Sequence, residues 1–571
     1  MSGTATALHR ARVTNHIGII ALVVLCVISF FVSLGASDVS LMEARNLVTA
    51  REMAAQNNWL IPTMNGEIRL AKPPMPTWFV AAISRLAGSS DDLSILRLPS
   101  ALAACLLVFS IYGLSLAMDG NSHRAFLCAA MLVTSALLIH MGRTASWDIF
   151  CHAFMAAALW ALWTGLHQGT GKRAFVLAGA CLGLSFMSKG PVSFYALLLP
   201  FFLAYLFVFG SSTIRSQWRG LCLALFICLL LSCWWPIYIL VYHADLARLV
   251  MHEETQAWGN HHVEPWWYYW NFLAYTGGWL VWAFAALLRP YAVERAGSRQ
   301  THAFLLLWLA AALVLLSLIP EKKERYLLPA MIPVVLVAGD LAYGVILRFR
   351  QDREQRADRM LVLIHCLLTG ALCVGLPVVL FVVLKQRHQA LDGAFFGYGL
   401  GSCIAAFCLP GFFIRRQVKR QLQTSIVFLA LTTLGASHYY AELSIRNTAY
   451  RTADRFLLDR QIGTSKVYFL GDPVDMKVIR DLGRRVYPWQ TQEVNRALAQ
   501  DEPVAVISKG EPSALLPNEL RTRVFIETID ILDYNKKRPD ARKIHIALLR
   551  AKEPGATGEL PASNPVPSHT G

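Results

Sequence analysis

Five basic residues stand in short polar segments between long apolar stretches: Lys72, Arg143, Lys189, Lys323 and Arg325. Cations of this kind can hold a phosphate group and stabilise it as a leaving group, because they offset the negative charge of the transition state. Lys189 lies between two apolar segments, where a charge is costly and therefore indicates function. Lys322, in the same run as Lys323, is expected instead to extend to lipid headgroups.

Two carboxylates are candidates for the other half of the chemistry. Glu43 lies shortly after the first apolar segment, and Asp148 opens a long apolar stretch with Arg143 as its nearest basic neighbour in the sequence. A carboxylate at either place can orient or deprotonate a hydroxyl group of a substrate. Asp148 could equally be a charge favoured by the helix dipole, and these residues alone leave both interpretations open. Glu52 is expected to face solvent.

The elements that must position these residues are membrane-spanning helices. Of 571 residues, 55% are hydrophobic and 16% are charged, whereas soluble domains carry about 25% charged residues. Apolar runs long enough to cross about 30 Å of hydrocarbon recur from residue 16 to residue 440. In lipid such runs must be helices, because no water is available to bind their backbone groups. The pattern predicts about thirteen spans.

The charges of the short loops predict the orientation. If the N-terminus is cytoplasmic, most basic residues of the short loops fall on the cytoplasmic side, as the positive-inside rule requires. The net charge of +16 then needs no nucleic acid as a partner. By the same rule, the outer side of the membrane should hold the first long loop (residues 38–93), the second (residues 242–268) and everything after residue 440.

The cysteines predict no disulfide or zinc site. All twelve fall between Cys26 and Cys408 without a C-x-x-C pair, which favours small core residues over disulfides or zinc ligands.

The chain divides into a membrane module, residues 1–440, and a polar C-terminal part. Residues 441–551 alternate expected strands (466–470, 504–508 and 543–549) with expected helices (475–483 and 491–500), which predicts a small periplasmic α/β domain. Residues 552–571 are rich in Pro, Gly and Ser, a composition that predicts disorder.

The first long loop carries an ordered set of motifs. It begins with an expected amphipathic helix whose Leu47, Val48 and Met53 should face lipid. Arg51-Glu52-Met53, Asn65-Gly66 and Lys72-Pro73-Pro74 then follow in order. This set resembles the first periplasmic loop of GT-C glycosyltransferases of the dolichyl-phosphate-mannose protein mannosyltransferase and aminoarabinose transferase superfamily.

The resemblance continues to about residue 345 and covers Trp147-Asp148, Ser188-Lys189-Gly190, residues 261–269 and Lys323–Pro329. It implies an all-α polytopic membrane protein of the GT-C type in the bacterial inner membrane. It further implies an inverting glycosyltransferase that moves a sugar from a polyprenyl-phosphate donor to lipid A, another glycolipid or a protein. The expected partners are this donor, the acceptor and membrane lipids.

The resemblance also assigns residues to roles. The expected catalytic residues are Glu43 and Asp148. The donor phosphate is expected to contact Lys72, Arg143, Lys189, Lys323, Arg325 and Tyr326. The acceptor, or the loops around it, should be positioned by Arg45, Arg69, His261, His262 and Glu264. Two departures matter: the superfamily's paired Asp-Glu reads Met42-Glu43, with Asp38 as the nearest substitute, and a Glu that often precedes Lys-Pro-Pro is Ala71.

A divalent metal could be bound by His261, His262 and Glu264, but their spacing fixes no third ligand. Histidines beside four aromatic residues, here Trp266 to Tyr269, more often belong to an interfacial aromatic belt. The metal ligands therefore stay open.

Two other functions are compatible with a polytopic membrane protein. A transporter or lipid flippase should show paired halves with broken helices and acidic residues near the middle of the membrane. The sequence has no evident internal repeat, and its candidate residues gather at one interface. A membrane scaffold would leave the dense polar first loop unexplained.

Overall fold

The computed structural model describes residues 16–168, 171–260, 262–447, 449–540 and 542–552. Within it the chain divides into two compact units, Met1–Ser444 and Ile445–Gly571. The predicted disordered tail lies outside the described residues apart from Lys552.

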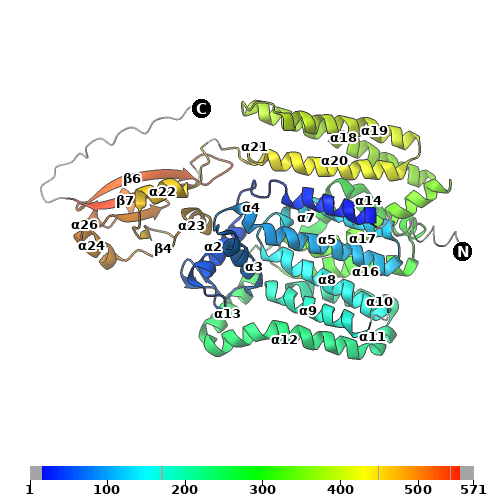
Figure 1. Ribbon diagram of the computed structural model, residues 1–571, viewed down its shortest axis with the longest axis horizontal. Coiled ribbons are helices and arrows are strands. Elements are labelled where there is room, and N and C mark those ends of the chain that lie inside the picture. Colours follow the sequence, from blue (N-terminus) through cyan, green and yellow to red (C-terminus); the bar gives the residue numbers. More distant parts are fainter. Residues whose placement is uncertain (1–15, 169–170, 261, 448, 541, 553–571) are drawn as a thin grey trace. The chain divides into compact units, whose positions relative to one another are not determined.

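The first unit is a bundle of apolar helices (Figure 1). Seven helical segments of the described chain are long and apolar enough to cross a membrane, and an eighth results if α6 (Ser122–Val133) and α7 (Ala136–Gly142), bent by 67°, form one span. The seven segments are Leu93–Asp119 (α4 and α5), Trp147–His167 (α8), Trp218–Tyr242 (α12), Arg299–Leu318 (α16), Glu324–Arg350 (η4 and α17), Arg356–Gln386 (α18) and Gly393–Ile414 (α19).

Shorter or more polar helices complete the bundle. They are His16–Phe31, which ends in η1 (Val27–Phe31), α9 (Lys172–Lys189), η2 (Phe194–Leu198) with α10 (Leu199–Phe209), η3 (Tyr268–Trp279) with α14 (Leu280–Leu287), and α20 (Val418–His438). Short helices connect them: α11 (Ser212–Ser216), α15 (Arg289–Val293) and α21 (Tyr440–Ser444).

The predicted count of about thirteen spans is not confirmed. The 18 residues of α9 include three basic ones, and the eight residues of α14 rise only about 12 Å along a helix axis. Predicted spans of this kind lack the length or the hydropathy that identifies a crossing helix by itself.

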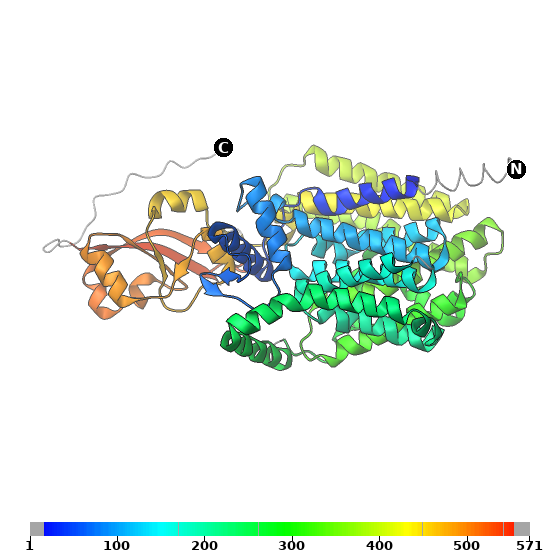
Figure 2. The same cartoon turned by 60° about the horizontal axis from the view of Figure 1, so that its bottom comes forward.

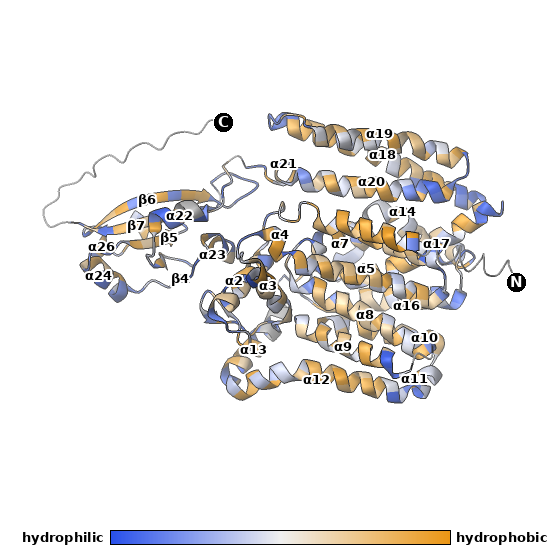
Figure 3. Ribbon diagram, in the orientation of Figure 1, coloured by the Kyte–Doolittle hydropathy of each residue, from blue (hydrophilic) through white to orange (hydrophobic). Residues whose placement is uncertain are grey.

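The helices at the centre of the bundle differ from those at its edge. In the most apolar window, 83% of α8 and 89% of α17 is buried inside the protein, whereas 22% of α18 and of α19 is buried. Apolar side chains such as Leu230 on α12 and Phe407 on α19 are 62% and 86% exposed. Figure 3 shows apolar residues along these outer helices and hydrophilic residues at the helix ends. This is the surface expected of a multi-pass membrane protein.

The polar segments around the first long loop gather at one end of the bundle (Figures 1 and 2). They are α2 (Leu41–Gln56), the hairpin of β1 (Thr63–Met64) and β2 (Glu67–Ile68), α3 (Met75–Ala87), α4 (Leu93–Leu96) and α13 (Ala244–Asn260). The 3-10 helix η4 (Glu324–Leu327) precedes α17 (Leu328–Arg350), and α5 covers Leu98–Asp119.

Two expectations for α2 were wrong. Leu47, Val48 and Met53 do not face lipid: they are 4%, 0% and 1% exposed and are packed inside the protein, where α2 contacts α3. Glu52 does not face solvent either. It is 9% exposed, and its Oε2 accepts hydrogen bonds from the Thr63 hydroxyl and the Gly66 N–H. Glu52 thereby fixes the hairpin to the helix.

The second unit contains a five-stranded sheet in the order β4-β3-β5-β7-β6. The strands are β3 (Val467–Phe469), β4 (Val486–Tyr487), β5 (Val504–Ser508), β6 (Val524–Asp533) and β7 (Lys543–Ala551). β3 pairs in parallel with β4 and β5, whereas β7 is antiparallel to β5 and β6. Its helices are α22 (Arg455–Ile462), α23 (Met476–Leu482), α24 (Thr491–Ala499), α25 (Pro512–Leu515) and α26 (Asn518–Arg521).

Candidate active site

A buried ion-pair cluster forms where α8 begins and α9 ends. Asp148, in the first turn of α8, bonds through Oδ1 to the Nζ of Lys189, the last residue of α9. The Nε of Arg325, in η4, lies 3.5 Å from Asp148 Oδ2. The side chains of Asp148 and Lys189 are only 2% and 5% exposed, whereas that of Arg325 is 25% exposed. Three predicted site residues thus come together from three separate elements.

Tyr326 extends this cluster. Its ring faces three cations: Lys189 Nζ lies 4.8 Å, Arg325 Cζ 5.4 Å and Lys323 Nζ 5.9 Å from the ring centroid. An aromatic ring attracts cations at such distances through its quadrupole. The structure therefore groups Asp148, Lys189, Lys323, Arg325 and Tyr326 as one set, which we call the Asp148 cluster.

The Asp148 cluster carries more positive than negative charge. Lys323 is paired with Glu321, which leaves one carboxylate, Asp148, facing Lys189 and Arg325. In the described structure the buried Nε of Arg325 has no hydrogen-bond partner. A guanidinium presents several donors in a fixed plane and suits phosphate recognition. The cluster can therefore accept an anion next to Arg325 without losing its internal pair.

Glu43 belongs to a different buried pair. Arg97, at the junction of α4 and α5, donates from Nε and Nη2 to the two carboxylate oxygens over 2.6 and 2.9 Å, and both side chains are fully buried. The N–H of Ala145 also donates to Glu43 Oε1 over 2.9 Å. Glu43 completes a capping box with Ser40. Its carboxylate is thus engaged in holding α2, α5 and the segment before α8 together.

Arg143 is bound to backbone rather than aimed at the Asp148 cluster. Its guanidinium donates to the carbonyls of Ser29, Val32 and Ser33 over 3.1, 2.8 and 2.7 Å, at the end of the first helix. Helix ends leave carbonyls without partners, and a basic side chain satisfies them. The arrangement assigns Arg143 an anchoring contact.

Lys322 does not extend to lipid headgroups, contrary to expectation. It is 4% exposed, and its Nζ donates to the carbonyls of Glu264, Ile319 and Pro320. Burial lowers the pKa of Lys322. Lys322 therefore connects the second long loop to the segment that carries the Asp148 cluster.

The first loop contacts the start of α8 through Arg69. Arg69 places its Cζ 4.9 Å from the ring centroid of Trp147, the residue before Asp148, and Lys72 is half-buried. Arg45, also half-buried, contacts the sulfur of Met42 over 3.7 Å. Asn46 donates to the carbonyl of Ala145 over 2.9 Å. The loop is therefore attached to the segment that leads into Asp148.

The second loop presents its candidates at the surface. His262 and Glu264 are exposed, and a backbone bridge from Val263 to Glu321 joins this loop to the η4 segment. His261 lies outside the described residues. Among the residues that the structure describes, no group of three or more His, Cys, Asp and Glu side chains could hold a metal ion.

Sequence reasoning missed Arg97, Asn46 and His152. His152 is 1% exposed, and its Nδ1 has no hydrogen-bond partner in the described structure. It lies one helical turn after Asp148, and that four-residue spacing could have identified it. Nothing in the sequence around Arg97 indicates that it binds Glu43, because the two residues are 54 positions apart.

Comparison with known proteins shows which proteins the chain resembles. The family described as dolichyl-phosphate-mannose-protein mannosyltransferase matches residues 71–236. An undecaprenyl phosphate-alpha-4-amino-4-deoxy-L-arabinose arabinosyl transferase of Pseudomonas savastanoi pv. phaseolicola is 26% identical over 353 residues, 60% of this chain and 63% of that protein. A second such transferase, from Pseudomonas fluorescens Pf0-1, is 26% identical over 437 residues, 73% of this chain and 74% of that protein.

The fold is shared with a solved structure. The crystal structure of ArnT from Cupriavidus metallidurans bound to undecaprenyl phosphate superimposes with a TM-score of 0.68 at 16% identity, covering 93% of this chain and 97% of that one. The family match, these relatives and the shared fold support a GT-C glycosyltransferase of the protein mannosyltransferase and aminoarabinose transferase superfamily. The resemblance of its loop motifs is thereby confirmed. The superfamily match at 71–236 includes Lys72, Arg143, Asp148 and Lys189.

Proposed function

We propose that the protein transfers a sugar, with inversion, from a polyprenyl-phosphate donor to lipid A or another acceptor at the outer face of the inner membrane. The observation that carries this proposal is the Asp148 cluster, in which one nearly buried and two partly exposed cations outnumber the carboxylates at one end of a membrane bundle. The names of the relatives, aminoarabinose transferases that use undecaprenyl phosphate, supply the class of donor and reaction.

The donor phosphate would bind on the exposed side of the cluster. Arg325 and Lys323 have side chains 25% exposed, and Lys72 is half-buried on the first loop. Lys189, nearly fully buried behind Tyr326, would add its charge without direct access. As the bond between the sugar C1 and the phosphate oxygen breaks, these cations stabilise the phosphate that leaves. Arg143 is proposed as an anchor of the first helix and not as a donor ligand, because three carbonyls bind it.

Asp148 would position the cations. Its carboxylate contacts Lys189 and Arg325 and is 2% exposed, so we propose that it orients both side chains toward the donor. Glu43 is fully buried against Arg97, and we propose that it holds the first loop in place. Arg45 and Arg69, with His262 and Glu264 of the exposed second loop, stay candidates for positioning the acceptor.

This arrangement favours an acceptor that needs no general base. Glu43 is paired with Arg97, and Asp148 faces Lys189 and Arg325, so the oxygens of both candidate carboxylates are already occupied by protein groups. A phosphate monoester is already anionic at neutral pH, because its second pKa is about 6. A phosphate oxygen of lipid A could attack C1 directly, whereas a sugar or protein hydroxyl would require deprotonation. We therefore favour lipid A phosphate over a hydroxyl acceptor.

The proposed topology has the N-terminus in the cytoplasm and residues 441–551 in the periplasm. In the bundle, α2 and α3 of the first loop lie at one end (Figures 1 and 2). Arg325 of the Asp148 cluster precedes α17, whereas Arg348 and Arg350 lie in the last turn of that helix, at its opposite end. Basic residues collect on the cytoplasmic side of membrane proteins. The Asp148 cluster would then face the periplasm, where lipid A is accessible.

The test is turnover by the purified full chain. We expect the protein in detergent to convert undecaprenyl-phosphate-linked aminoarabinose and lipid A into modified lipid A and free undecaprenyl phosphate, both detected by mass spectrometry. The variant Arg325→Ala, which should convert less donor at a limiting donor concentration, serves as the impaired comparison, and Lys385→Ala, which removes an exposed cation at the end of α18, serves as the matched control. A protein that moves the donor across vesicles without consuming it would be the transporter or flippase that competes with this proposal.

A further inference from the structure

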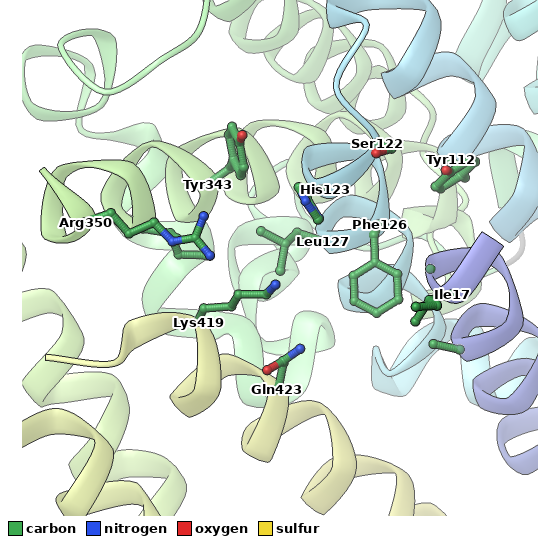
Figure 4. A pocket seen from close by; sticks show the side chains of 13 residues that line it. Ile17, Tyr112, Ser122, His123, Phe126, Leu127, Tyr343, Arg350, Lys419 and Gln423 are labelled. Carbon is green, nitrogen blue, oxygen red and sulfur yellow. The ribbon is translucent and has the colours of Figure 1, made fainter. Parts of the chain in front are cut away.

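A second cationic cavity lies at the end of the bundle opposite to the Asp148 cluster. It measures about 260 Å³ and lies between the first helix, α5, α6, α17 and α20. Figure 4 shows Arg350 of α17, Lys419 of α20 and His123 of α6 around it, with Ile17, Phe126 and Leu127 on its apolar side. We propose that this cavity binds the phosphate headgroup of an anionic membrane phospholipid, with an acyl chain along the first helix.

The charges of the cavity lack local compensation. No acidic side chain lines it among the described residues, and neither Arg350 nor Lys419 forms an ion pair with another described residue. The neighbouring Arg124 differs, because it pairs with Asp119 at 2.8 Å and with Asp340 at 3.1 Å. Two cations from separate helices directed at one cavity repel each other unless an anion lies between them. The arrangement therefore favours an anionic ligand.

The walls of the cavity indicate that the anion carries an apolar chain. Phe126 and Leu127 line its inner side, and Ile17 of the first helix, 62% exposed, lies at its edge. Apolar residues of a membrane helix with that exposure face hydrocarbon. A soluble phosphate would gain nothing from this wall, whereas a phospholipid places its headgroup at the helix ends and its chain beside the helix. Basic pockets between transmembrane helices bind lipid headgroups in this way.

The proposal is independent of the transfer reaction, because none of these residues belongs to the Asp148 cluster. Its test is native mass spectrometry of the full chain in detergent, with phosphatidylglycerol, phosphatidylcholine or inorganic phosphate added. We expect phosphatidylglycerol to stay bound, phosphatidylcholine to bind less, and inorganic phosphate not to displace the lipid. If inorganic phosphate displaced phosphatidylglycerol, the cavity would be a site for a soluble anion, and the proposal of a lipid ligand would be overturned.

The double variant Arg350→Gln/Lys419→Gln should bind phosphatidylglycerol about 30-fold more weakly, because each cation near an anionic headgroup contributes a factor of about five. The matched control Arg415→Gln/Arg420→Gln removes two exposed cations close to Lys419 in the sequence that do not line the cavity, and it should lose less than threefold. Equal loss in both variants would reveal only general attraction and refute the site.

A third variant keeps the test decisive if the double variant fails to fold. Ala21 lines the apolar side of the cavity, so Ala21→Phe should fill it without changing any charge. We expect phosphatidylglycerol binding to fall at least tenfold in Ala21→Phe. Unchanged binding in this variant would place the lipid elsewhere and overturn the proposal.

Discussion

Replacing Asp148 by Asn should destabilise the protein more than replacing its partner Lys189 by Met. Asp148→Asn leaves both Lys189 and Arg325 without their shared carboxylate, whereas Lys189→Met leaves Asp148 with Arg325 at 3.5 Å. Breaking one partner out of a buried ion pair costs about 3–5 kcal/mol. Because the side chains of Asp148 and Lys189 are 2% and 5% exposed, solvent screens the pair little. We expect Asp148→Asn near the upper value and Lys189→Met near the lower one.

The double variant separates the pair from its surroundings. Asp148→Asn/Lys189→Met removes both charges, so its cost should be at least about 2 kcal/mol below the sum of the single costs. Thermal unfolding in detergent ranks the four proteins; because a membrane protein of this size unfolds irreversibly, midpoints at one scan rate are compared. Activity should be lost in all three variants. A double variant whose midpoint falls by the sum of the single shifts would show that the two side chains do not interact.

Three further predictions test the remaining parts of the site and its orientation. Glu43→Gln should lower the unfolding midpoint, because fully buried Arg97 loses its counter-charge at a cost of about 3–5 kcal/mol; loss of turnover at an unchanged midpoint would instead support a catalytic Glu43. Arg325→Ala should raise the KM for the donor, and it should also lower kcat if the contact tightens in the transition state; donor kinetics equal to wild type would exclude Arg325 as a ligand. Accessibility tags inserted after Arg350 and near Asn57 should report the cytoplasm and the periplasm respectively, and both tags on one side would overturn the topology.

Apolar length predicted the long membrane helices, and the placement of charges selected several residues of the candidate site, in both cases for physical reasons. Apolar length identifies long helices such as α17 and α18, because few other structures satisfy a backbone in lipid. Apolar length does not identify α14, because its eight residues are too few to cross a membrane and continue the preceding helix η3. In the second unit, β5 has the bounds expected from its apolar run. By contrast, β4 is two residues long, and β6 mixes buried, half-buried and exposed residues without regular alternation, so both gave too little pattern.

The site shows a similar division. Lys189 and Arg325 could be selected because charges beside apolar spans are costly without a purpose. Asp148 was selected as well, but its direct contact with Lys189 could not be read from the sequence, because the two residues are 41 positions apart and meet only through the packing of α8 against α9. Arg143 was selected as a phosphate-binding candidate, and Lys322 was expected to extend to lipid headgroups. In the structure both side chains donate to backbone carbonyls.

The contacts of Glu43 bear on the loss of the neighbouring acid, since Met42 stands where the superfamily motif has Asp. The superfamily's paired Asp-Glu reads Met42-Glu43 here, so Glu43 is the one acid of that pair that this chain keeps. It accepts from both nitrogens of Arg97 and from Ala145, which uses its oxygens inside the protein. Turning it outward would leave Arg97 buried without a counter-charge, which is more costly than the pair itself. Glu43 therefore does not act as a free carboxylate while it holds Arg97, and under the proposed function an acceptor that arrives already ionised needs no such base.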